Sequence, residues 1–474
     1  MSAINFLNKI GHILSSQQIL HRAEDTELYR LSPRGFYEHK LTAVLLPETT
    51  QQVAAIMRAA YETKTSIIPQ GGNTGLVGAQ QGVVGQENIV LSLKRMDKII
   101  NIDAANFTVL LEAGVILENL HAELGKRSLY FPLQLASQGS CCIGGNLSTN
   151  AGGTAVLAYG SMRDLCLGLE VVLPDGRVLN DLRFVKKDNS GYDLKNLFIG
   201  AEGTLGIITK AVLKLWPQPR QRQFAYIACE NLKQVLAVFA KARQAFGQEL
   251  EAYELLSDFA MQLSLQYLNK TSLFTKQHAW YVLLGLACLD NEAKGHLRLE
   301  DLLQNALAVG LIQDAVVAQN QVQENYFWQL RENVSAAQKH VGVSIKNDIS
   351  VPINNMVEFL KFGASIVAQH CPTARIVCFG HIGDGNLHYN ILVPAGYTAQ
   401  ENAEFLDLWQ PISAALNTLV VQLGGSIAAE HGIGQLKRSA LEIFKDPVAY
   451  TLMLSIKQQL DPHNIMNPHK ILNL

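Results

Sequence analysis

The chain has 474 residues, which at roughly 150 residues per domain predicts three lobes, or two with one of them large. Lys and Arg number 39 against 41 Asp and Glu, so the net charge of −2 gives no support to nucleic-acid binding. A hydrophobic share of 48% argues against a disordered chain. The seven cysteines include no Cys-x-x-Cys pair, which fits neither a disulfide framework nor a cysteine zinc module and indicates a reducing compartment.

The sequence shows no signal for secretion or for membrane insertion. Its first residues lack the basic start and the long apolar core of a secretory signal peptide. No apolar run is long enough to span a bilayer as a helix. We therefore expect a cytoplasmic protein that is soluble or at most peripheral, with no transmembrane segment.

The first half predicts short strands, helices and glycine-rich turns of the α+β class. A helix capped by Thr50 leads into a strand over 65–69, and the next strand, over 88–93, follows without a helix between them. The Rossmann fold is therefore excluded, because it needs a strand, a glycine loop and a helix in that order. The other elements expected in this half are a strand over 109–114, a helix over 117–126 and a hairpin over 168–179 on Asp-Gly.

A break in the pattern separates the two halves. Residues 216–219 contain two prolines and predict a linker. Beyond it, strands alternate with longer amphipathic helices, such as 232–246 and 297–309, which predicts a second domain up to about residue 428. The tail from Gly434 is expected to be mostly helical.

Four glycine clusters in the first half are the strongest functional signal there. Such clusters are either turns that need positive φ or backbone held close to a ligand whose phosphates accept amide hydrogen bonds. Several separated clusters suit a long dinucleotide better than a single nucleotide, but the residues alone leave both explanations open. The clusters span 71–78, 139–146, 150–154 and 200–208.

Five motifs carry a resemblance that covers nearly the whole chain: residues 69–75, 143–153, 159–161, 191–194 and 198–208. Together they resemble the FAD-binding domain of the vanillyl-alcohol-oxidase type. Within that superfamily the chain is similar to the D-2-hydroxyacid dehydrogenases, and most of all to the D-2-hydroxyglutarate dehydrogenases. The resemblance implies an α+β fold with a two-lobed FAD-binding domain over 1–217 (core about 38–217), a substrate or cap domain with a metal site over 218–428, and a C-terminal segment over 429–474 that returns to the flavin.

The resemblance also implies which residues bind FAD, and that they bind it non-covalently. Residues 71–76 would hold the pyrophosphate, and the other motifs would line the isoalloxazine, ribose and adenine. Cys141 and Cys142 are interpreted as buried thiols and not as an attachment point. The expected FAD-binding residues are Gly71, Gly72, Asn73, Thr74, Gly75, Leu76, Gly139, Ser140, Gly144, Gly145, Asn146, Asn150, Gly152, Gly153, Tyr159, Gly160, Glu202, Gly203, Gly206, Ile207, Ile208 and Asn467.

A polar hairpin is predicted in the second half. Strands over 375–380 and 387–393, joined by a Gly-Asp-Gly turn, place His381 and His388 at facing ends of the hairpin. His388 and Asn390 share one face of the second strand, because side chains alternate along a strand. The hairpin therefore predicts two neighbouring imidazoles and an inward amide.

Two histidines and a carboxylate form the donor set of a catalytic Zn²⁺, and Mn²⁺, Co²⁺ or Fe²⁺ could use the same set. Spacing alone leaves open that the histidines are hydrogen-bonded structural residues. The resemblance implies that His381, His388 and Glu430 are metal ligands. It also implies that His431 is the active-site base, or a hydrogen-bond donor to the substrate.

Substrate binding is the expected role of a second polar group. Arg331 and Ser335 are predicted to share one face of a helix, with Lys346 beyond it. On the residues alone, such charges are usually solvated. The resemblance implies that these residues hold a substrate carboxylate, and a guanidinium fork beside an ammonium favours a dicarboxylate. Asn390 and His431 complete the expected substrate-binding set.

The resemblance therefore implies an FAD- and metal-dependent dehydrogenase that transfers a hydride from a D-2-hydroxyacid to flavin N5. The expected substrate is D-2-hydroxyglutarate, which would become 2-oxoglutarate, and D-lactate, D-malate and glycolate are the alternatives. A zinc hydrolase and a non-catalytic flavoprotein subunit are rival hypotheses. Electron-transfer flavoprotein or a quinone is the expected electron acceptor, and a homodimer is kept as a hypothesis.

Overall fold

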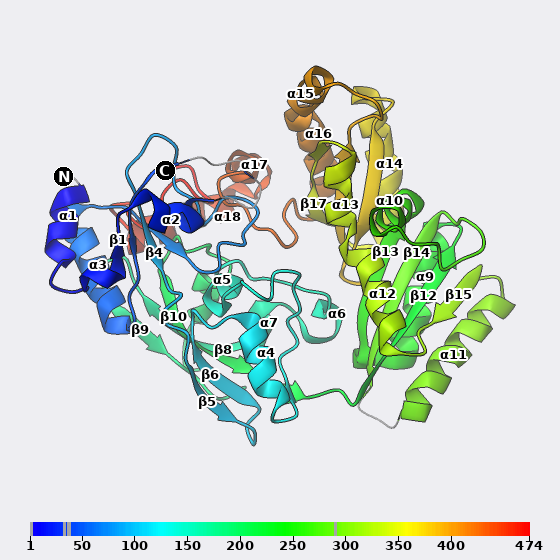
Figure 1. Ribbon diagram of the computed structural model, residues 1–474, viewed down its shortest axis with the longest axis horizontal. Coiled ribbons are helices and arrows are strands. Elements are labelled where there is room, and N and C mark those ends of the chain that lie inside the picture. Colours follow the sequence, from blue (N-terminus) through cyan, green and yellow to red (C-terminus); the bar gives the residue numbers. More distant parts are fainter. Residues whose placement is uncertain (1–2, 32–34, 36–38, 289–291) are drawn as a thin grey trace. The chain divides into compact units, whose positions relative to one another are not determined.

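The computed structural model describes residues 3–31, 35, 39–288 and 292–474, so residue 38, the expected start of the domain core, lies outside the described residues. The chain divides into two units (Figure 1). Unit 1 comprises Met1–Gly153, Gly160–Pro217 and Glu430–Leu474, and unit 2 comprises Thr154–Tyr159 and Gln218–Ala429. Unit 1 is therefore assembled from segments that are far apart in the sequence.

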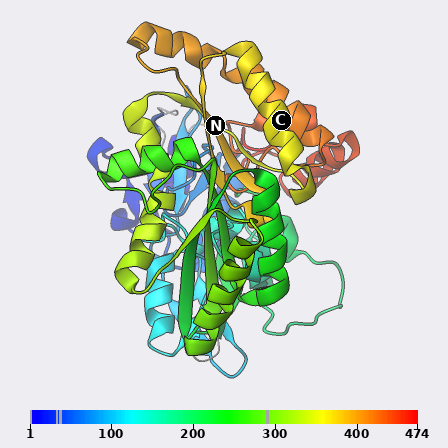
Figure 2. The ribbon, with the colours of Figure 1, turned by 90° about the vertical axis from the view of Figure 1, so that its right-hand side faces the viewer.

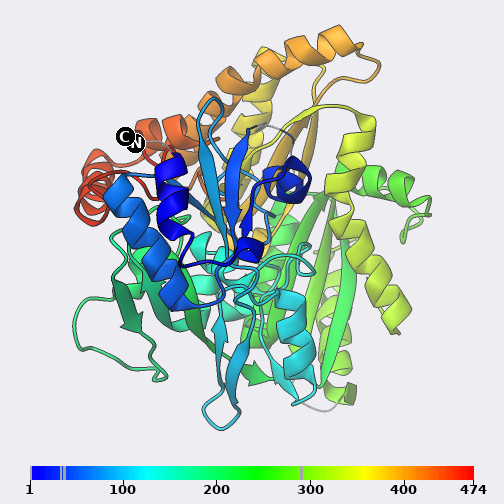
Figure 3. The ribbon, with the colours of Figure 1, turned by 60° about the vertical axis from the view of Figure 1, so that its left-hand side comes forward.

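The first part of unit 1 is a mixed sheet of four strands with three helices. Its elements are α1 (Ala3–Ile10), β1 (Ile19–Leu20), α2 (Ala23–Arg30), β2 (Leu41–Leu45), α3 (Thr50–Thr63), β3 (Ile67–Gln70) and β4 (Asn88–Ser92). The strand order is β1-β2-β4-β3, and β4 runs parallel to both of its neighbours. Figure 3 shows α1 and α3, the dark-blue and blue helices, side by side. As predicted, no helix separates β3 from β4.

The expected cap of α3 was wrong by one residue. The side chain of Thr49 accepts a hydrogen bond from the Gln52 amide and caps the helix. Thr50 is buried instead, and its hydroxyl donates to Glu170 Oε1 at 2.6 Å. Thr50 therefore ties the helix to the second sheet of the unit.

The second part of unit 1 is an antiparallel sheet of five strands in the order β5-β6-β10-β8-β9. Its elements and those around it are β5 (Ile99–Asp103), β6 (Thr108–Glu112), α4 (Leu117–Gly125), β7 (Leu129–Tyr130), α5 (Ile143–Ser148), α7 (Met162–Leu165), β8 (Cys166–Val172), β9 (Val178–Asp181), α8 (Lys195–Phe198), β10 (Ile207–Lys214) and β11 (Trp216–Pro217). The predicted hairpin is β8–β9, and Gly176 supplies the positive φ of its turn at 84°. Buried side chains of β8 and β10, such as Leu169 and Ala211, form part of the core.

The C-terminal segment completes unit 1. It carries helices α17 (Arg438–Phe444) and α18 (Pro447–Leu460), and then runs past β3. The Ile67 amide donates to the Ile465 carbonyl at 2.8 Å, and the Asn467 amide donates to the Ile67 carbonyl at 2.9 Å. Ile67 of β3 is thus hydrogen-bonded through both its amide and its carbonyl group to the C-terminal segment.

Unit 2 contains one antiparallel sheet in the order β15-β12-β14-β13-β18-β19-β16, with β17 also paired to β19. Its strands are β12 (Gln221–Cys229), β13 (Leu250–Ser257), β14 (Trp280–Cys288), β15 (Asp314–Val317), β16 (Ser344–Ile345), β17 (Asp348–Ser350), β18 (Arg375–Gly380) and β19 (Asn386–Leu392). Its helices are α6 (Val156–Tyr159), α9 (Leu232–Phe246), α10 (Asp258–Leu268), α11 (Glu292–Ala308), α12 (Gln321–Glu332), α13 (Val334–Val341), α14 (Met356–His370), α15 (Ala399–Asp407) and α16 (Trp409–Gln422).

Helices cover both faces of this sheet. Alternate residues of β12, such as Phe224 and Tyr226, pack with Phe327 of α12 and with α10 in one core. Helices α9 and α11 pack against β12 as well, and Figure 2 shows green helices across the strands. Among the residues that the structure describes, none of the helices has both the length and the apolar character needed to cross a bilayer.

Candidate active site

Three of the four glycine clusters of unit 1 meet at one pocket. Its wall includes Gly71, Gly72, Asn73, Thr74, Gly75, Gly144, Gly145, Asn146, Glu202, Gly203, Gly206, Ile207 and Ile208, all of them expected FAD-binding residues. The wall also includes Pro69, Gln70, Ala79, Gln80, Leu93, Ala113, Cys142, Ser148 and Thr149, which the sequence analysis did not select. These additional residues flank the glycines in the sequence or lie on neighbouring strands.

The loop over 71–76 has the properties of an anion site. Within the described part of the chain, the backbone N–H groups of this loop donate to no backbone or side-chain acceptor. Its backbone also passes very close to the loop before α5, because a Cβ added at Gly72 would lie 2.0 Å from the Ser140 carbonyl oxygen. Unpaired amides around a cavity suit phosphate oxygens, so the loop fits the pyrophosphate of FAD.

Replacing Gly72 by Ala is therefore expected to reduce FAD binding. The new methyl group cannot fit beside Ser140 without a shift of backbone, which should destabilise the protein by about 1–3 kcal/mol and widen the loop. Flavin absorbance per protein and the melting temperature measure the two effects. Gly125→Ala is the control, since nothing lies within 4 Å of a Cβ there. Full flavin content in the Gly72 variant would contradict the close-approach role of this glycine.

The remaining expected FAD-binding residues do not line this pocket in the described structure: Leu76, Gly139, Ser140, Asn150, Gly152, Gly153, Tyr159, Gly160 and Asn467. Asn467 lies directly behind the wall, since its side-chain amide donates to the carbonyls of Ala79 and Glu202 at 2.9 and 2.7 Å. Its Oδ1 atom is buried and has no partner within the described residues. This Oδ1 atom is therefore available to accept a hydrogen bond from a bound ligand.

Tyr159 belongs to unit 2, in the short helix α6. Burial raises its pKa to about 12, and the neighbouring Glu251 carboxylate acts in the same direction. The side chain is therefore a neutral hydroxyl at physiological pH. Its expected contact with FAD stays a prediction.

The cysteines of the second loop are buried, as are the other five, and none of the seven forms a disulfide. Burial raises the pKa of Cys142 to about 11, and it also raises the pKa of Cys141. A thiol must ionise to act as a nucleophile, so these surroundings suppress its reactivity. The burial of both thiols supports non-covalent binding of FAD.

Glu202 lines the pocket, but its carboxylate group bonds to the C-terminal segment of unit 1. Its two oxygens accept hydrogen bonds from the backbone amides of Ile433 and Gly434, both at 2.7 Å. Burial raises the pKa of this carboxyl group to about 7, although the two amides and the nearby Lys470 lower it. Glu202 therefore holds the turn that directly follows Glu430 and His431.

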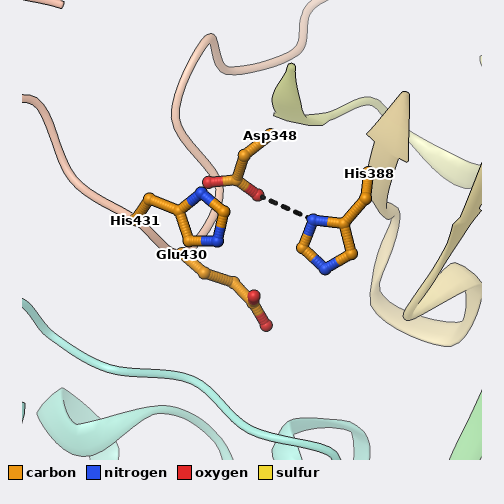
Figure 4. A group of neighbouring side chains, drawn as sticks. All are labelled: Asp348, His388, Glu430 and His431. Atoms are coloured by element: carbon orange, nitrogen blue, oxygen red, sulfur yellow. Dashed lines mark ion pairs between the residues drawn. The ribbon is translucent and has the colours of Figure 1, made fainter. Parts of the chain in front are cut away.

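Four potential metal ligands gather where the chain leaves unit 2. Donor atoms of Asp348, His388, Glu430 and His431 all lie within 4.8 Å of one another (Figure 4). Two of them come from paired strands, since Asp348 on β17 lies opposite His388 on β19. Glu430 follows the last residue of unit 2, and mutual backbone hydrogen bonds between Ser350 and Ser426 anchor that stretch to β17. Two imidazoles and two carboxylates form a donor set that suits a divalent transition-metal ion.

His381 stands beside this group. It directly follows β18, and its ring centroid lies 6.0 Å from that of His388. The predicted hairpin thus brings the two imidazoles together, with Gly385 providing a positive φ of 87° in the turn. His381 is not one of the four residues within 4.8 Å, and Asp348 is the additional one. Its expected role as a ligand stays a prediction.

A buried ionic group extends from His381. Its Nδ1 atom lies 2.6 Å from Glu254 Oε1, and Glu254 Oε2 accepts a hydrogen bond from Arg331 Nε at 2.7 Å. Burial alone would raise the pKa of Glu254, but the charges and hydrogen bonds of His381 and Arg331 together lower it to about 2. The guanidinium also stacks over the Phe379 ring at 5.0 Å. Glu254 is therefore a carboxylate that bridges two expected site residues.

The expected helix through Arg331 and Ser335 is two helices. Helix α12 ends at Glu332 and α13 begins at Val334, with Asn333 between them. Arg331 is buried, whereas Ser335 is exposed, so the prediction that they share one helix face was wrong. Lys346 lies between β16 and β17 and is half-buried. The break arises because Asn333 ends α12 with φ −77° and ψ −5°, a conformation that the sequence pattern did not reveal.

Asn390 is buried on β19, as the alternation of the strand predicts. Its amide group donates to Gln338 Oε1 at 3.1 Å, and its carbonyl oxygen accepts from the Asn347 amide at 3.3 Å. Hydrogen bonds thus fix the orientation of this side chain. The sequence analysis missed its partner Gln338, which is fully buried on α13.

Asp348 and Glu254 were also missed, although each had a sequence signal. Glu254 interrupts an apolar strand, and a carboxylate in such a strand must be paired when it is buried. Asp348 follows Lys346 at a spacing of two, which in a strand places both side chains on one face. Neither signal identifies the partner, because the partners come from other helices, strands and loops.

Comparisons with known proteins identify the family of the chain. Residues 41–181 match the model described as FAD binding domain, and residues 218–471 match the model described as FAD linked oxidases, C-terminal domain. A protein of Oryza sativa subsp. indica named probable D-2-hydroxyglutarate dehydrogenase, mitochondrial, is 36% identical over 97% of this chain and 80% of its own length. The D-2-hydroxyglutarate dehydrogenase of Xanthomonas citri pv. viticola is 36% identical over 90% of this chain and 89% of its own length.

Another relative has a different printed activity. The D-2-hydroxyglutarate–pyruvate transhydrogenase of Saccharomyces cerevisiae is 33% identical over 97% of this chain and 92% of its own length. Among solved structures, p-cresol methylhydroxylase with bound substrate matches at a TM-score of 0.77 with 18% identity, over 98% of this chain and 96% of that chain. An alkyldihydroxyacetonephosphate synthase matches at 0.73 with 19% identity, over 99% of this chain and 85% of that chain.

The structural neighbours confirm the predicted fold class. The two matching family models together include residues of both units. The relatives align along most of this chain and most of their own length. The chain therefore belongs to the FAD-linked oxidases, within the group of the D-2-hydroxyglutarate dehydrogenases, and is an FAD-dependent oxidoreductase.

Proposed function

We propose that the protein oxidises D-2-hydroxyglutarate to 2-oxoglutarate. The observation that carries this proposal is the donor group of Asp348, His388, Glu430 and His431, in a chain whose relatives are named for this substrate. A 2-hydroxyacid offers an adjacent hydroxyl and carboxylate, which are oxygen ligands for a divalent ion. The second carboxylate of the substrate needs a cation, and Arg331 and Lys346 of unit 2 are the expected ones.

The proposed ligands of the metal are His381, His388 and Glu430, and Asp348 is a fourth donor of suitable chemistry. When bound there, a divalent ion supplies a Lewis acid that lowers the pKa of a coordinated hydroxyl group. Zn²⁺ is the proposed ion, and Mn²⁺, Co²⁺ and Fe²⁺ suit the same donors. FAD supplies the acceptor for the hydride that leaves C2 of the substrate.

The protein's own groups would then bind, orient and deprotonate the substrate. His431 accepts the hydroxyl proton as general base, since imidazole is basic near neutral pH. Asn390, which is held by Gln338, donates its amide to the carboxylate beside the hydroxyl. Arg331, Lys346 and Ser335 bind the distal carboxylate. Fixing both ends of the substrate holds C2 in one orientation.

Anaerobic addition of substrate to the purified flavoprotein tests the proposal. D-2-Hydroxyglutarate is expected to bleach the flavin, and D-lactate is expected to do so much less. Prior chelation should abolish the bleaching, and Zn²⁺ should restore it. Bleaching mainly by D-lactate would keep the reaction class but contradict the dicarboxylate substrate. No bleaching by any D-2-hydroxyacid would contradict the function itself.

Three finer predictions remain part of the proposal. The electron acceptor is electron-transfer flavoprotein or a quinone, and a homodimer stays a hypothesis. The cytoplasmic location stays a prediction, because the plant and animal relatives carry the word mitochondrial in their names. D-Lactate, D-malate and glycolate remain the alternative substrates.

A further inference from the structure

A deeply buried carboxylate of unit 2 has two ionic partners, and both belong to the proposed site. The side chain of Glu254 is 1% exposed, with Arg331 on one oxygen and His381 on the other. Helix α12 contributes Arg331, and His381 directly follows β18, so the carboxylate connects two parts of the chain that are separate in the sequence. A buried charge with two partners of this kind strongly restrains both of them.

The position of Glu254 follows from the register of the sheet. β13 pairs with β18 so that Leu255 lies opposite Gly380 and Leu256 opposite Phe379. Glu254 therefore stands next to the point at which β18 ends and the chain turns at His381. The centroid of the Phe379 ring lies 5.0 Å from the guanidinium carbon of Arg331 and 4.9 Å from the ring centroid of His388. Arg331 therefore cannot leave the carboxylate without disturbing its packing against Phe379.

The contact to His381 defines where the imidazole proton resides. An ionised carboxylate only accepts hydrogen bonds, so Nδ1 at 2.6 Å from Oε1 must carry the proton. In a neutral ring, Nε2 is then the nitrogen with the lone pair that a metal ion needs. Histidine ligands typically donate their other N–H to a carboxylate in this way, and loss of that partner weakens metal binding.

We propose that Glu254 is a positioning residue, which holds His381 in the tautomer that ligates through Nε2 and fixes the Arg331 guanidinium for the distal carboxylate of the substrate. The inference rests on the proposed function, since it takes His381 as a metal ligand. It goes further, because one carboxylate then links the metal site to the subsite that selects a dicarboxylate.

The test is the affinity for Zn²⁺ of the flavin-loaded protein, measured by competition with a chelating dye. Glutamine has the shape of glutamate but offers one acceptor and one donor to a site that presents two donors. Glu254→Gln is therefore expected to weaken Zn²⁺ binding about 10- to 100-fold while flavin content stays unchanged. An affinity within threefold of the wild type, in a variant that melts cooperatively, would overturn the proposal.

Glu251→Gln is the matched control. Glu251 lies on the same strand, is also buried and pairs with Arg222 at 2.9 Å. Its loss should lower stability, as at Glu254, but should leave the affinity for Zn²⁺ within threefold of the wild type. Equal weakening by both variants would show a general effect of losing a buried charge and would contradict the positioning role.

A measurement on the unmodified protein covers the case in which Glu254→Gln does not fold. In protein labelled with ¹⁵N-histidine and loaded with Zn²⁺, His381 should show a protonated Nδ1 and an unprotonated Nε2, with its signals assigned by their loss in His381→Gln. A proton on Nε2 would overturn the proposal. A wild-type protein that binds no Zn²⁺ would instead contradict the proposed function, and the tautomer of His381 would still decide the role of Glu254.

Discussion

Replacing His431 by Asn is expected to lower kcat for D-2-hydroxyglutarate by about 10²- to 10⁴-fold, the range over which a positioned general base acts. Flavin content should not change, because the residues that line the FAD pocket do not include His431. Asparagine keeps a polar side chain of similar length but cannot accept a proton near neutral pH. Stopped-flow measurement of flavin reduction under anaerobic conditions gives this rate directly.

Two further readouts separate loss of the base from a change in the metal site. The variant should bind Zn²⁺ within about tenfold of the wild type, since His388, Glu430 and Asp348 remain. Its rate of flavin reduction should rise with pH more steeply than that of the wild type, because hydroxide must replace the base. His340→Asn, at an exposed position on α13, is the control and should reduce its flavin at the normal rate. Normal reduction in the His431 variant would exclude it as the base.

Replacing Arg331 by Met is expected to change the choice of substrate. The loss of a charged hydrogen-bond donor from a carboxylate subsite is worth about 1.5–3 kcal/mol, so kcat/KM for D-2-hydroxyglutarate should fall about 10- to 150-fold. D-Lactate lacks the distal carboxylate, and its kcat/KM should change by less than about threefold. The ratio of the two kcat/KM values, measured on one preparation, is independent of the fraction of active protein.

The structure adds an effect on stability to this prediction. Arg331→Met leaves Glu254 buried without one of its two partners, and breaking a buried ion pair destabilises a protein by about 3–5 kcal/mol. Arg222→Met is a matched control, because Arg222 pairs with a buried glutamate of the same strand. It should lower the melting temperature without changing the ratio of substrates. An equal loss on both substrates in the Arg331 variant would contradict the anchoring role.

Local patterns predicted most of the elements correctly. The bounds expected for α9 agree with the structure at both ends, and the Asp-Gly turn of β8–β9 and the glycine turn of β18–β19 were expected from the turn residues themselves. These features depend on residues adjacent in the sequence, through helix periodicity and through the positive φ that glycine allows. The sequence did not reveal two helix boundaries, the one before α3 at Thr49 and the one after α12 at Asn333. Each depends on the backbone conformation of a single residue.

The side-chain partners within the candidate site were less predictable. Residue types and spacing identify His388 and Glu430 as potential ligands, but they do not reveal that Asp348 lies beside them. Glu254 is 127 residues from His381 in the sequence. Contacts of this kind depend on the register between strands, and register is fixed by the packing of the whole sheet.

The position of the C-terminal segment has a consequence for synthesis. Ile67 on β3 makes backbone hydrogen bonds to Ile465 and Asn467, so unit 1 stays incomplete until residues 465–467 have left the ribosome. The intervening stretch from Gln218 to Ala429 takes roughly 10 to 40 s to translate at about 5–20 residues per second. During that interval the edge of β3 offers unpaired backbone groups to other chains. FAD loading is therefore expected to follow synthesis of residues 465–467, and nascent chains stalled within unit 2 are expected to be prone to aggregate.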